Sequence, residues 1–165
     1  MYRLLLKRKG LILAIFVAAI NINFAYGQNC SATLSVEKDR NAKSAYQDNG
    51  ATFNMVLTNT SSRKATYNIL TENLSESCAS DTYKTSAPNV PLNVEIKGHV
   101  SSNAASSSIT LAAGETRKFT IYVTVPARTA SKSWSCIKVS AKGVDCNQSL
   151  SSTILRVYVP EPSEG

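Results

Sequence analysis

Four cysteines are the residues of this chain with the most definite chemistry. They are Cys30, Cys78, Cys136 and Cys146, and all four follow an N-terminal segment with the features of an export signal. An even number of cysteines in an exported chain indicates disulfide bonds. The chain has no C-x-x-C and no cysteine–histidine spacing of the kind that holds zinc. We therefore predict structural disulfides and no bound metal.

Acid–base catalysis requires groups that this sequence does not bring together in a motif. The single histidine, His99, follows Gly98, and no nucleophile-elbow motif lies near it. The eleven acidic residues are scattered, mostly at turns, without the paired arrangement that glycoside hydrolysis needs. Phosphate-binding, dinucleotide-binding and calcium-loop motifs are also missing. The sequence predicts a protein with no catalytic residues and no cofactor.

Trp134 is the side chain best suited to contact a ligand. Alternation along its strand places Trp134 on the same face as Cys136 and opposite the apolar Ile137. A surface tryptophan beside an outward-facing Tyr122 or Tyr158 could stack on a sugar or a peptide. The alternative is that Trp134 packs over a disulfide or fills the rim of the core.

The charge distribution argues against a nucleic-acid partner. The whole chain has a net charge of +7, but four of its 18 basic residues lie within residues 1–27. The remainder carries 14 basic and 11 acidic residues, a net charge of +3. Its lysines and arginines are spread singly apart from two pairs, whereas a nucleic-acid surface needs clustered cations. We expect a solvated surface.

Residues 1–27 have the three parts of a secretory signal peptide. A basic start is followed by an apolar run of 12 residues from Leu11 to Ile22, and then by the small residues of Ala25-Tyr26-Gly27. A membrane-spanning helix needs about 20 apolar residues, so this run is too short to span a membrane. The alternative is that the segment is an uncleaved anchor. We expect cleavage, no membrane insertion afterwards, and a secreted or periplasmic protein.

The rest of the chain alternates apolar and polar residues with the period of β-strands. Turn signals separate these runs, so we predict one antiparallel β-sandwich over residues 28–160, followed by a short tail over residues 161–165. Residues 98–108 are predicted to be a polar connection, with a short strand at 109–111. The seven main strands are predicted around residues 32–36, 53–57, 67–69, 92–96, 119–125, 137–141 and 155–159.

Two phrases resemble a known architecture. ITLAAGETRKFTIYVTVP, residues 109–126, is similar to the consensus of bacterial immunoglobulin-like and fibronectin type III-like accessory domains. FNMVLTNTSSRKATYNI, residues 53–69, resembles the second and third strands of such domains. The resemblance covers about residues 31–159 and implies a binding or spacer module, often found beside enzymes or surface proteins. The second strand has no cysteine, so the inter-sheet disulfide of antibody domains is absent.

The predicted sandwich favours one of three cysteine pairings. With alternating strand directions, Cys30 and Cys146 lie at one end of the sandwich, and Cys78 and Cys136 lie at the other. The third and sixth strands are neighbours in such a fold, which brings the second pair within disulfide reach. We predict Cys30–Cys146 and Cys78–Cys136. The alternative is a local Cys136–Cys146 bridge together with Cys30–Cys78.

These observations predict a non-catalytic binding or adhesion module that engages a protein or a glycan through its loops or an edge strand. A structural subunit or spacer of a cell-envelope assembly is the second hypothesis, and a small enzyme or enzyme inhibitor is the third. Four N-glycosylation sequons are expected to be unused, because the resemblance is to bacterial domains. They begin at Asn29, Asn59, Asn73 and Asn147.

Overall fold

The structure, a computed structural model, describes residues 30–77, 89–98, 101–103, 106–146 and 149–161. The predicted signal peptide at 1–27, His99 and Cys78 lie outside these residues. No helix within the described ranges is long and apolar enough to cross a membrane. The signal peptide and the domain boundaries therefore stay predictions.

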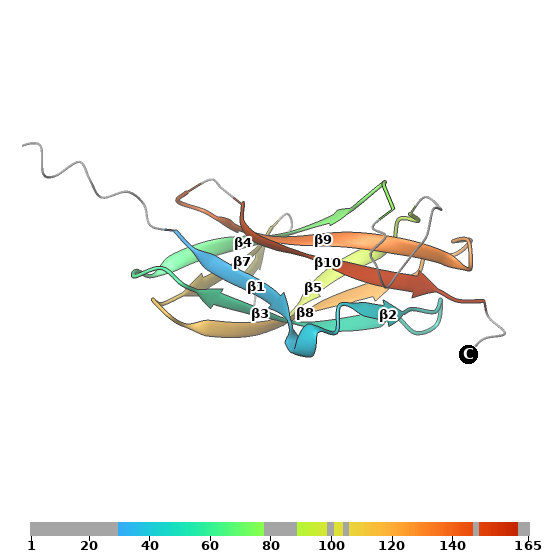
Figure 1. The fold of residues 1–165 in the computed structure, drawn as a ribbon, viewed down its shortest axis with the longest axis horizontal. Helices are drawn as coiled ribbons and strands as arrows, with labels where there is room; N and C mark the ends of the chain where they lie inside the picture. The colour runs from blue at the N-terminus through green and yellow to red at the C-terminus, as the bar shows by residue number, and fades with distance from the viewer. Residues whose placement is uncertain (1–29, 78–88, 99–100, 104–105, 147–148, 162–165) are drawn as a thin grey trace, which may run out of the picture.

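Two β-sheets face each other across a common core (Figure 1). The four-stranded sheet has the order β1 (Ala32–Val36), β3 (Ala51–Asn59), β8 (Thr116–Thr124), β5 (Asn93–Lys97). The six-stranded sheet has the order β2 (Ala42–Ser44), β10 (Ser149–Val159), β9 (Ser133–Gly143), β4 (Ala65–Asn73), β7 (Ser106–Leu111), β6 (Ser101–Asn103). A single 3-10 turn, η2 (Glu37–Asp39), follows β1. The prediction of an all-β sandwich is confirmed.

The seven predicted strands correspond to β1, β3, β4, β5, β8, β9 and β10, but the strand count and the 98–108 connection need correction. Residues 101–103 form β6, and β7 begins at Ser106 within the segment predicted to be a connection. The short β2 was also not predicted, and it pairs with β10 in parallel rather than antiparallel. Three-residue strands, and strands made of serine, carry no apolar alternation, so their pairing depends on the neighbouring strand.

The core comes from the alternation that the sequence displays. In β3, Phe53, Met55 and Leu57 are completely buried, and the residues between them face outward. Ile121 and Val123 of β8 lie beside them on the same inner face. Burying such a side chain stabilises the fold by about 1.5–3 kcal/mol. β10 ends at Val159, directly before Pro160, because proline has no N–H to donate to a ladder.

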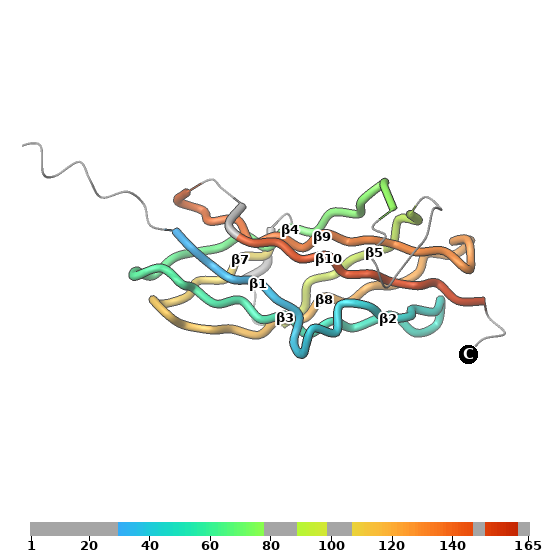
Figure 2. The backbone as a smooth tube through the Cα atoms, in the orientation of Figure 1, coloured from blue at the N-terminus to red at the C-terminus, as the bar shows by residue number. Residues whose placement is uncertain are grey.

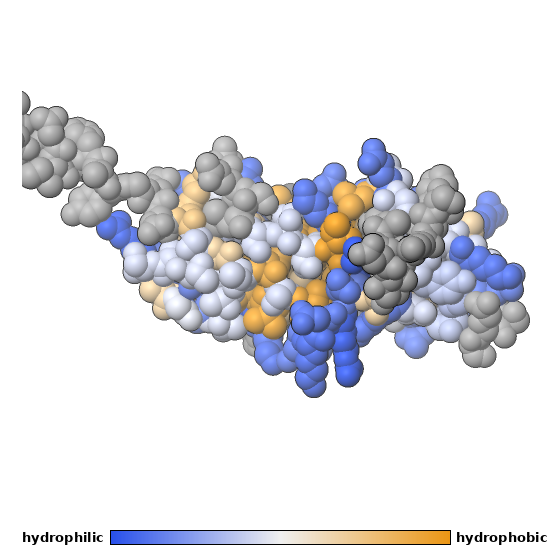
Figure 3. Space-filling view, in the orientation of Figure 1, coloured by the Kyte–Doolittle hydropathy of each residue, from blue (hydrophilic) through white to orange (hydrophobic). Residues whose placement is uncertain are grey.

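The two sheets contact each other along one side of the sandwich, where β1 and β10 meet. β1 runs alongside β10 (Figure 2), and the Leu34 backbone N–H donates to the Ser151 hydroxyl at 3.0 Å. Hydrophobic residues gather in the middle of this face, between polar ends (Figure 3). The hydroxyl of Ser151 therefore satisfies part of the free edge of β1.

Candidate functional site

Trp134 and Tyr158 form an aromatic pair on the outer face of the six-stranded sheet. They are direct partners in the antiparallel register of β9 and β10. Their ring centroids lie 5.3 Å apart with the planes tilted by 45°, an arrangement that aromatic rings favour. Both side chains are half-buried. The two longest strands of the fold thus hold the pair at a fixed spacing.

A shallow depression adjoins this pair at the β2 edge of the sheet. Its volume is about 260 Å³, and Ser44 of β2 is the register partner of Tyr158. The aromatic surface is therefore bordered by a hydroxyl and by the backbone of a short strand. The lining residues are Ala42, Lys43, Ser44, Trp134 and Tyr158.

Tyr122, the third predicted contact residue, lies elsewhere. It belongs to β8 and therefore to the other sheet. The ammonium of Lys97 lies 4.1 Å from its ring centroid, and a Cβ added at Gly50 would come within 2.9 Å of the ring. Alternation assigns a residue to a face of its strand but does not tell which sheet holds the strand. Tyr122 is thus not a part of the Trp134–Tyr158 surface.

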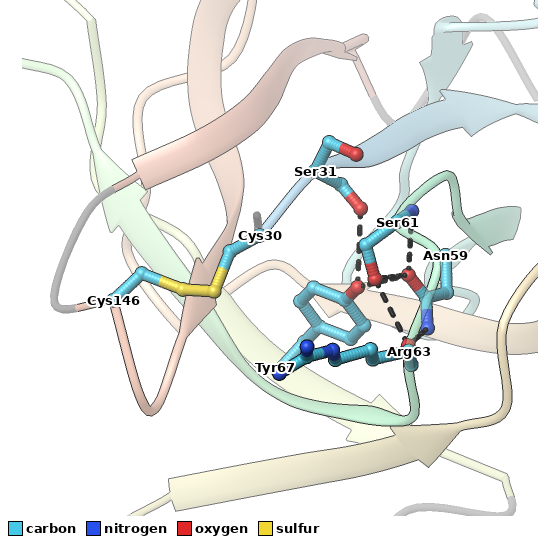
Figure 4. The surroundings of a disulfide bond; sticks show 7 residues. All are labelled: Cys30, Ser31, Asn59, Ser61, Arg63, Tyr67 and Cys146. Carbon is cyan, nitrogen blue, oxygen red and sulfur yellow. Dashed lines mark hydrogen bonds between the residues drawn. A yellow bond between two sulfur atoms is a disulfide. The ribbon is translucent and has the colours of Figure 1, made fainter. Parts of the chain in front are cut away.

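The predicted Cys30–Cys146 disulfide is present, with the two Cα atoms 6.4 Å apart (Figure 4). Its presence excludes the alternative bridge between Cys136 and Cys146. Cys136 is itself disulfide-bonded, whereas Cys78 lies outside the described residues, so the pairing of Cys78 with Cys136 stays a prediction. The neighbouring backbone supports it, because the Leu74 N–H just after β4 donates to the Cys136 carbonyl at 2.8 Å.

Asn59 forms a polar cluster beside the Cys30–Cys146 disulfide that the sequence analysis did not predict (Figure 4). Its side chain is completely buried. The Oδ1 atom accepts hydrogen bonds from the Ser61 N–H at 2.9 Å, the Ser61 hydroxyl at 2.6 Å and the Tyr67 hydroxyl at 2.7 Å. The Nδ2 atom donates to the carbonyls of Arg63, Leu111 and Ala112.

The position of Asn59 carries a signal for this role. It follows Leu57 at the period of two, so it occupies an inward position of β3. A polar residue at an inward position must find internal partners. The same burial gives a physical reason why the sequon at Asn59 is unsuitable for glycosylation in the folded protein.

Asn73 performs a similar task where the chain crosses from one sheet to the other. Its Nδ2 donates to the Leu92 carbonyl at 3.0 Å, and its Oδ1 accepts from the Leu92 N–H at 3.2 Å. The Asn73 side chain thus makes the two hydrogen bonds that the backbone of a neighbouring strand would otherwise make with Leu92, and it joins the end of β4 to the segment that enters β5. Asn89 reinforces this crossing by donating to the carbonyls of Leu74 and Glu76.

The carboxylates with shifted pKa values lie away from the aromatic pair. The Lys118 ammonium, 2.5 Å from Glu37, lowers the pKa of Glu37 by hydrogen bonding and charge. The pKa of Glu115 is lowered mainly by the hydrogen bond from the Ala112 N–H, and to a smaller extent by the hydrogen bond from Arg117. Both shifts favour the ionised form, the opposite of what a general acid needs. Within the described ranges, no three His, Cys, Asp or Glu residues cluster as metal ligands would.

Two facing β-sheets around one apolar core define a β-sandwich domain. The model of the family described as "IG-like fold at C-terminal of FixG, putative oxidoreductase" matches residues 24–155, and the chain belongs to this family. The match confirms the resemblance to bacterial immunoglobulin-like domains.

The solved structures that the chain matches are distant in sequence. The FixG-related protein from Vibrio parahaemolyticus is 9% identical, with a TM-score of 0.46 over 80% of this chain and 96% of that one. A family 123 glycoside hydrolase from Clostridium perfringens is 10% identical, with a TM-score of 0.47 over 79% and 27%. The periplasmic chaperone SfaE is 10% identical, with a TM-score of 0.44 over 79% and 58%. No curated protein matches the chain.

Proposed function

We propose that this protein is a non-catalytic, exported binding module whose ligand surface is the Trp134–Tyr158 face. The observation that carries the proposal is the pairing of these two rings at 5.3 Å beside a depression on an outer sheet face. Tryptophan and tyrosine are enriched among the residues that dominate binding energy. A half-buried pair presents apolar area to a ligand and loses little side-chain entropy on binding.

The scaffold supports a binding role because it holds the pair rigidly. β9 and β10 are 11 residues long and are paired along most of their length, and sites on paired strands are held more precisely than sites on loops. The family's description locates its domain at the C-terminal of FixG, which supports an accessory role for this one. Export is supported by the 1–27 segment and by the Cys30–Cys146 disulfide, since disulfides persist in oxidising compartments.

A structural subunit or spacer of an envelope assembly is the second candidate function. It is favoured by the family's position at the end of a larger protein. The two functions differ in the surface they need, because a spacer acts through its ends and its length. Loss of the aromatic pair should therefore impair a binding module and leave a spacer unaffected.

Co-sedimentation with envelope particles of the source organism tests the proposal. We expect the purified exported protein and Tyr122→Ala to sediment with the particles, and Trp134→Ala and Tyr158→Ala to bind at least tenfold more weakly. Tyr122 is the matched control because it is a partly exposed tyrosine on the opposite sheet. Circular dichroism and thermal unfolding establish that each variant is folded. Equal binding by all four proteins, or none by any, refutes the proposed surface.

A further inference from the structure

A second depression lies where β10 finishes. This end of the sandwich carries the β2 label in Figure 1. The volume of the depression is about 240 Å³, below the range of about 300–1,000 Å³ that is typical of pockets for drug-sized ligands. Three segments meet there: the turn after β2, the loop between β8 and β9, and the end of β10. The lining residues are Tyr46, Gln47, Asp48, Thr129, Ser131, Val159 and Pro160.

The walls of this depression are held by internal hydrogen bonds. The turn after β2 is closed by mutual backbone bonds between Tyr46 and Asn49, at 2.8 and 3.3 Å. It is attached to β10 because the Ala45 N–H donates to the Tyr158 carbonyl at 2.9 Å. In the opposite wall, the Thr129 hydroxyl donates to the Pro126 carbonyl at 2.7 Å. The shape is thus largely formed without a ligand.

The loop between β8 and β9 also holds two non-glycine residues in the left-handed region. Arg128 has a φ of 67° and Lys132 a φ of 55°, a conformation that costs free energy for residues with a Cβ. They flank Thr129 and Ser131, which line the depression. The backbone therefore keeps a specific shape at a conformational cost.

The chemistry of the lining fits a sugar ring. A pyranose has apolar C–H faces, which pack on aromatic rings such as Tyr46, and a rim of hydroxyls that both donate and accept hydrogen bonds. Gln47 offers a donor and an acceptor, and Asp48 offers acceptors. The Ser131 hydroxyl can donate and accept, whereas the Thr129 hydroxyl gives its proton to the Pro126 carbonyl and can only accept. Few other small ligands combine an apolar face with so many hydroxyls.

The same lining disfavours the competing ligand classes. Among the described lining residues Asp48 is the only charged group, so an anionic ligand would meet the repulsion of this carboxylate in the depression. The nearby Lys132 ammonium lies 3.0 Å from the Glu161 carboxylate, which neutralises it. A lipid chain would have to desolvate the amide, carboxylate and hydroxyl groups without pairing them.

The two depressions adjoin each other. Ser44 lines one and Tyr46 the other. Likewise Tyr158 of β10 lines one, and Pro160, directly after the end of β10, lines the other. Two residues of extended chain span about 7 Å, so successive rings of one oligosaccharide can reach both places. The aromatic pair offers a second stacking surface for the neighbouring ring.

We propose that this end of the sandwich binds a neutral oligosaccharide, with one ring in the Tyr46–Asp48 depression and its neighbour against Trp134 and Tyr158. The proposal rests on the proposed function and names the ligand class of that surface. It also adds a subsite formed by Tyr46, Gln47, Asp48, Thr129 and Ser131.

Tryptophan fluorescence provides a direct test because Trp134 is the only tryptophan in the chain. The purified exported protein is titrated with chitotetraose, cellotetraose, maltotetraose and mannotetraose. We expect a saturable change of emission with at least one of them. Asp48→Ala and Tyr46→Ala should raise the apparent Kd at least tenfold, and Tyr122→Ala should leave it unchanged. No saturable change with any of the four, or unchanged affinity in both variants, overturns the proposal.

Protease treatment of the envelope particles separates this proposal from the proposed function. Binding that depends on Trp134 and survives removal of envelope proteins by proteinase K supports a carbohydrate ligand. Binding that depends on Trp134 but is abolished by the protease shows a protein partner, so the carbohydrate proposal fails while the proposed function stands. Absence of Trp134-dependent binding to either preparation refutes both.

Discussion

The Tyr67 hydroxyl donates a 2.7 Å hydrogen bond to the Oδ1 atom of Asn59, and both side chains are completely buried. Tyr67 also reaches the Ser31 carbonyl at 3.1 Å, next to Cys30 of the disulfide (Figure 4). A single polar cluster therefore connects β3, β4 and the start of β1. Buried polar groups that are fully paired specify one arrangement of their neighbours, so this cluster fixes how the two sheets meet at that end.

Asn59→Ala should be among the most destabilising single substitutions in the protein. It removes the acceptor of the Ser61 N–H and a donor to the Leu111 carbonyl in a buried site. Each unpaired buried group costs about 1–3 kcal/mol, so we expect the free energy of unfolding to fall by about 3–5 kcal/mol. Denaturant unfolding measures the change.

Asn54→Ala is the matched control for this substitution. Asn54 lies on the outer side of the same strand, is exposed, and makes one 3.3 Å hydrogen bond to Glu37. Its loss should change the free energy of unfolding by less than about 0.5 kcal/mol. Similar effects of the two alanine variants would contradict a special role for Asn59.

Tyr67 should make the protein sensitive to alkaline pH. Burial raises the pKa of Tyr67 above its ordinary value of 10.0, and the hydrogen bond with Ser61 opposes this only partly. Between the unfolded and folded pKa values the unfolded state binds fewer protons, so stability falls as the pH rises. Stability should therefore be constant with respect to this group below pH 10 and decline above it.

Tyr67→Phe isolates that contribution. The substitution keeps the ring in the core and removes the titrating hydroxyl, so the variant should be less stable at neutral pH by about 1–2 kcal/mol. It should also lose less stability than the wild type between pH 9 and 11. Urea unfolding at several pH values measures this. If the free energy of unfolding falls equally with pH in the two proteins over this range, the assigned direction of the Tyr67 pKa shift is refuted.

The Cys30–Cys146 bridge should contribute strongly to stability because it joins residues that are 116 positions apart in the sequence. Replacing both cysteines by serine should lower the free energy of unfolding by about 2–5 kcal/mol, mainly by releasing the unfolded chain. Denaturant midpoints of the double variant and the wild type measure this difference. A change below about 1 kcal/mol would indicate that the Asn59 cluster alone holds the end of the sandwich.

Peptide mapping without reduction checks the connectivity. The structure requires a Cys30–Cys146 peptide pair, and the sequence predicts a second pair that joins Cys78 to Cys136. The backbone bond between Leu74 and Cys136 leaves only four residues to reach Cys78. A peptide that contains Cys136 bonded to Cys146 would contradict both the structure and the prediction.

Sequence periodicity predicted the features of this fold that depend on one strand at a time. It placed Phe53, Met55 and Leu57 in the core, and strand direction placed Cys30 and Cys146 at one end. It could not assign Tyr122 and Trp134 to opposite sheets, because strand order is set by contacts between distant segments. For the same reason it missed β2, whose three residues form a strand only beside β10.

The polar features were harder to predict because the same residue types also mark turns. Asn59-Thr60-Ser61 has the composition of a turn, and Asn59 does lie at the end of β3. Its second role depends on Leu111, 52 positions away in the sequence, and on Tyr67, which belongs to a strand of the other sheet. The depression beside Tyr46 is likewise formed by three separate segments, so no local sequence motif predicts it.

Lys43 should protect the β2 edge against association between copies of the protein. It pairs in register with the buried Val157, and its ammonium lies 5.4 Å from the Phe53 ring centroid and donates to the Thr52 carbonyl. A strand added at β2 would have to bury this charge, which natural edge strands exploit to prevent pairing. Lys43→Val should therefore increase self-association, measured by sedimentation velocity over a range of concentrations. Lys142→Val is the control because it removes the same charge from β9, which is paired on both sides. This variant should sediment like the wild type. Equal association of the two variants would mean that net charge, rather than the edge position, prevents aggregation.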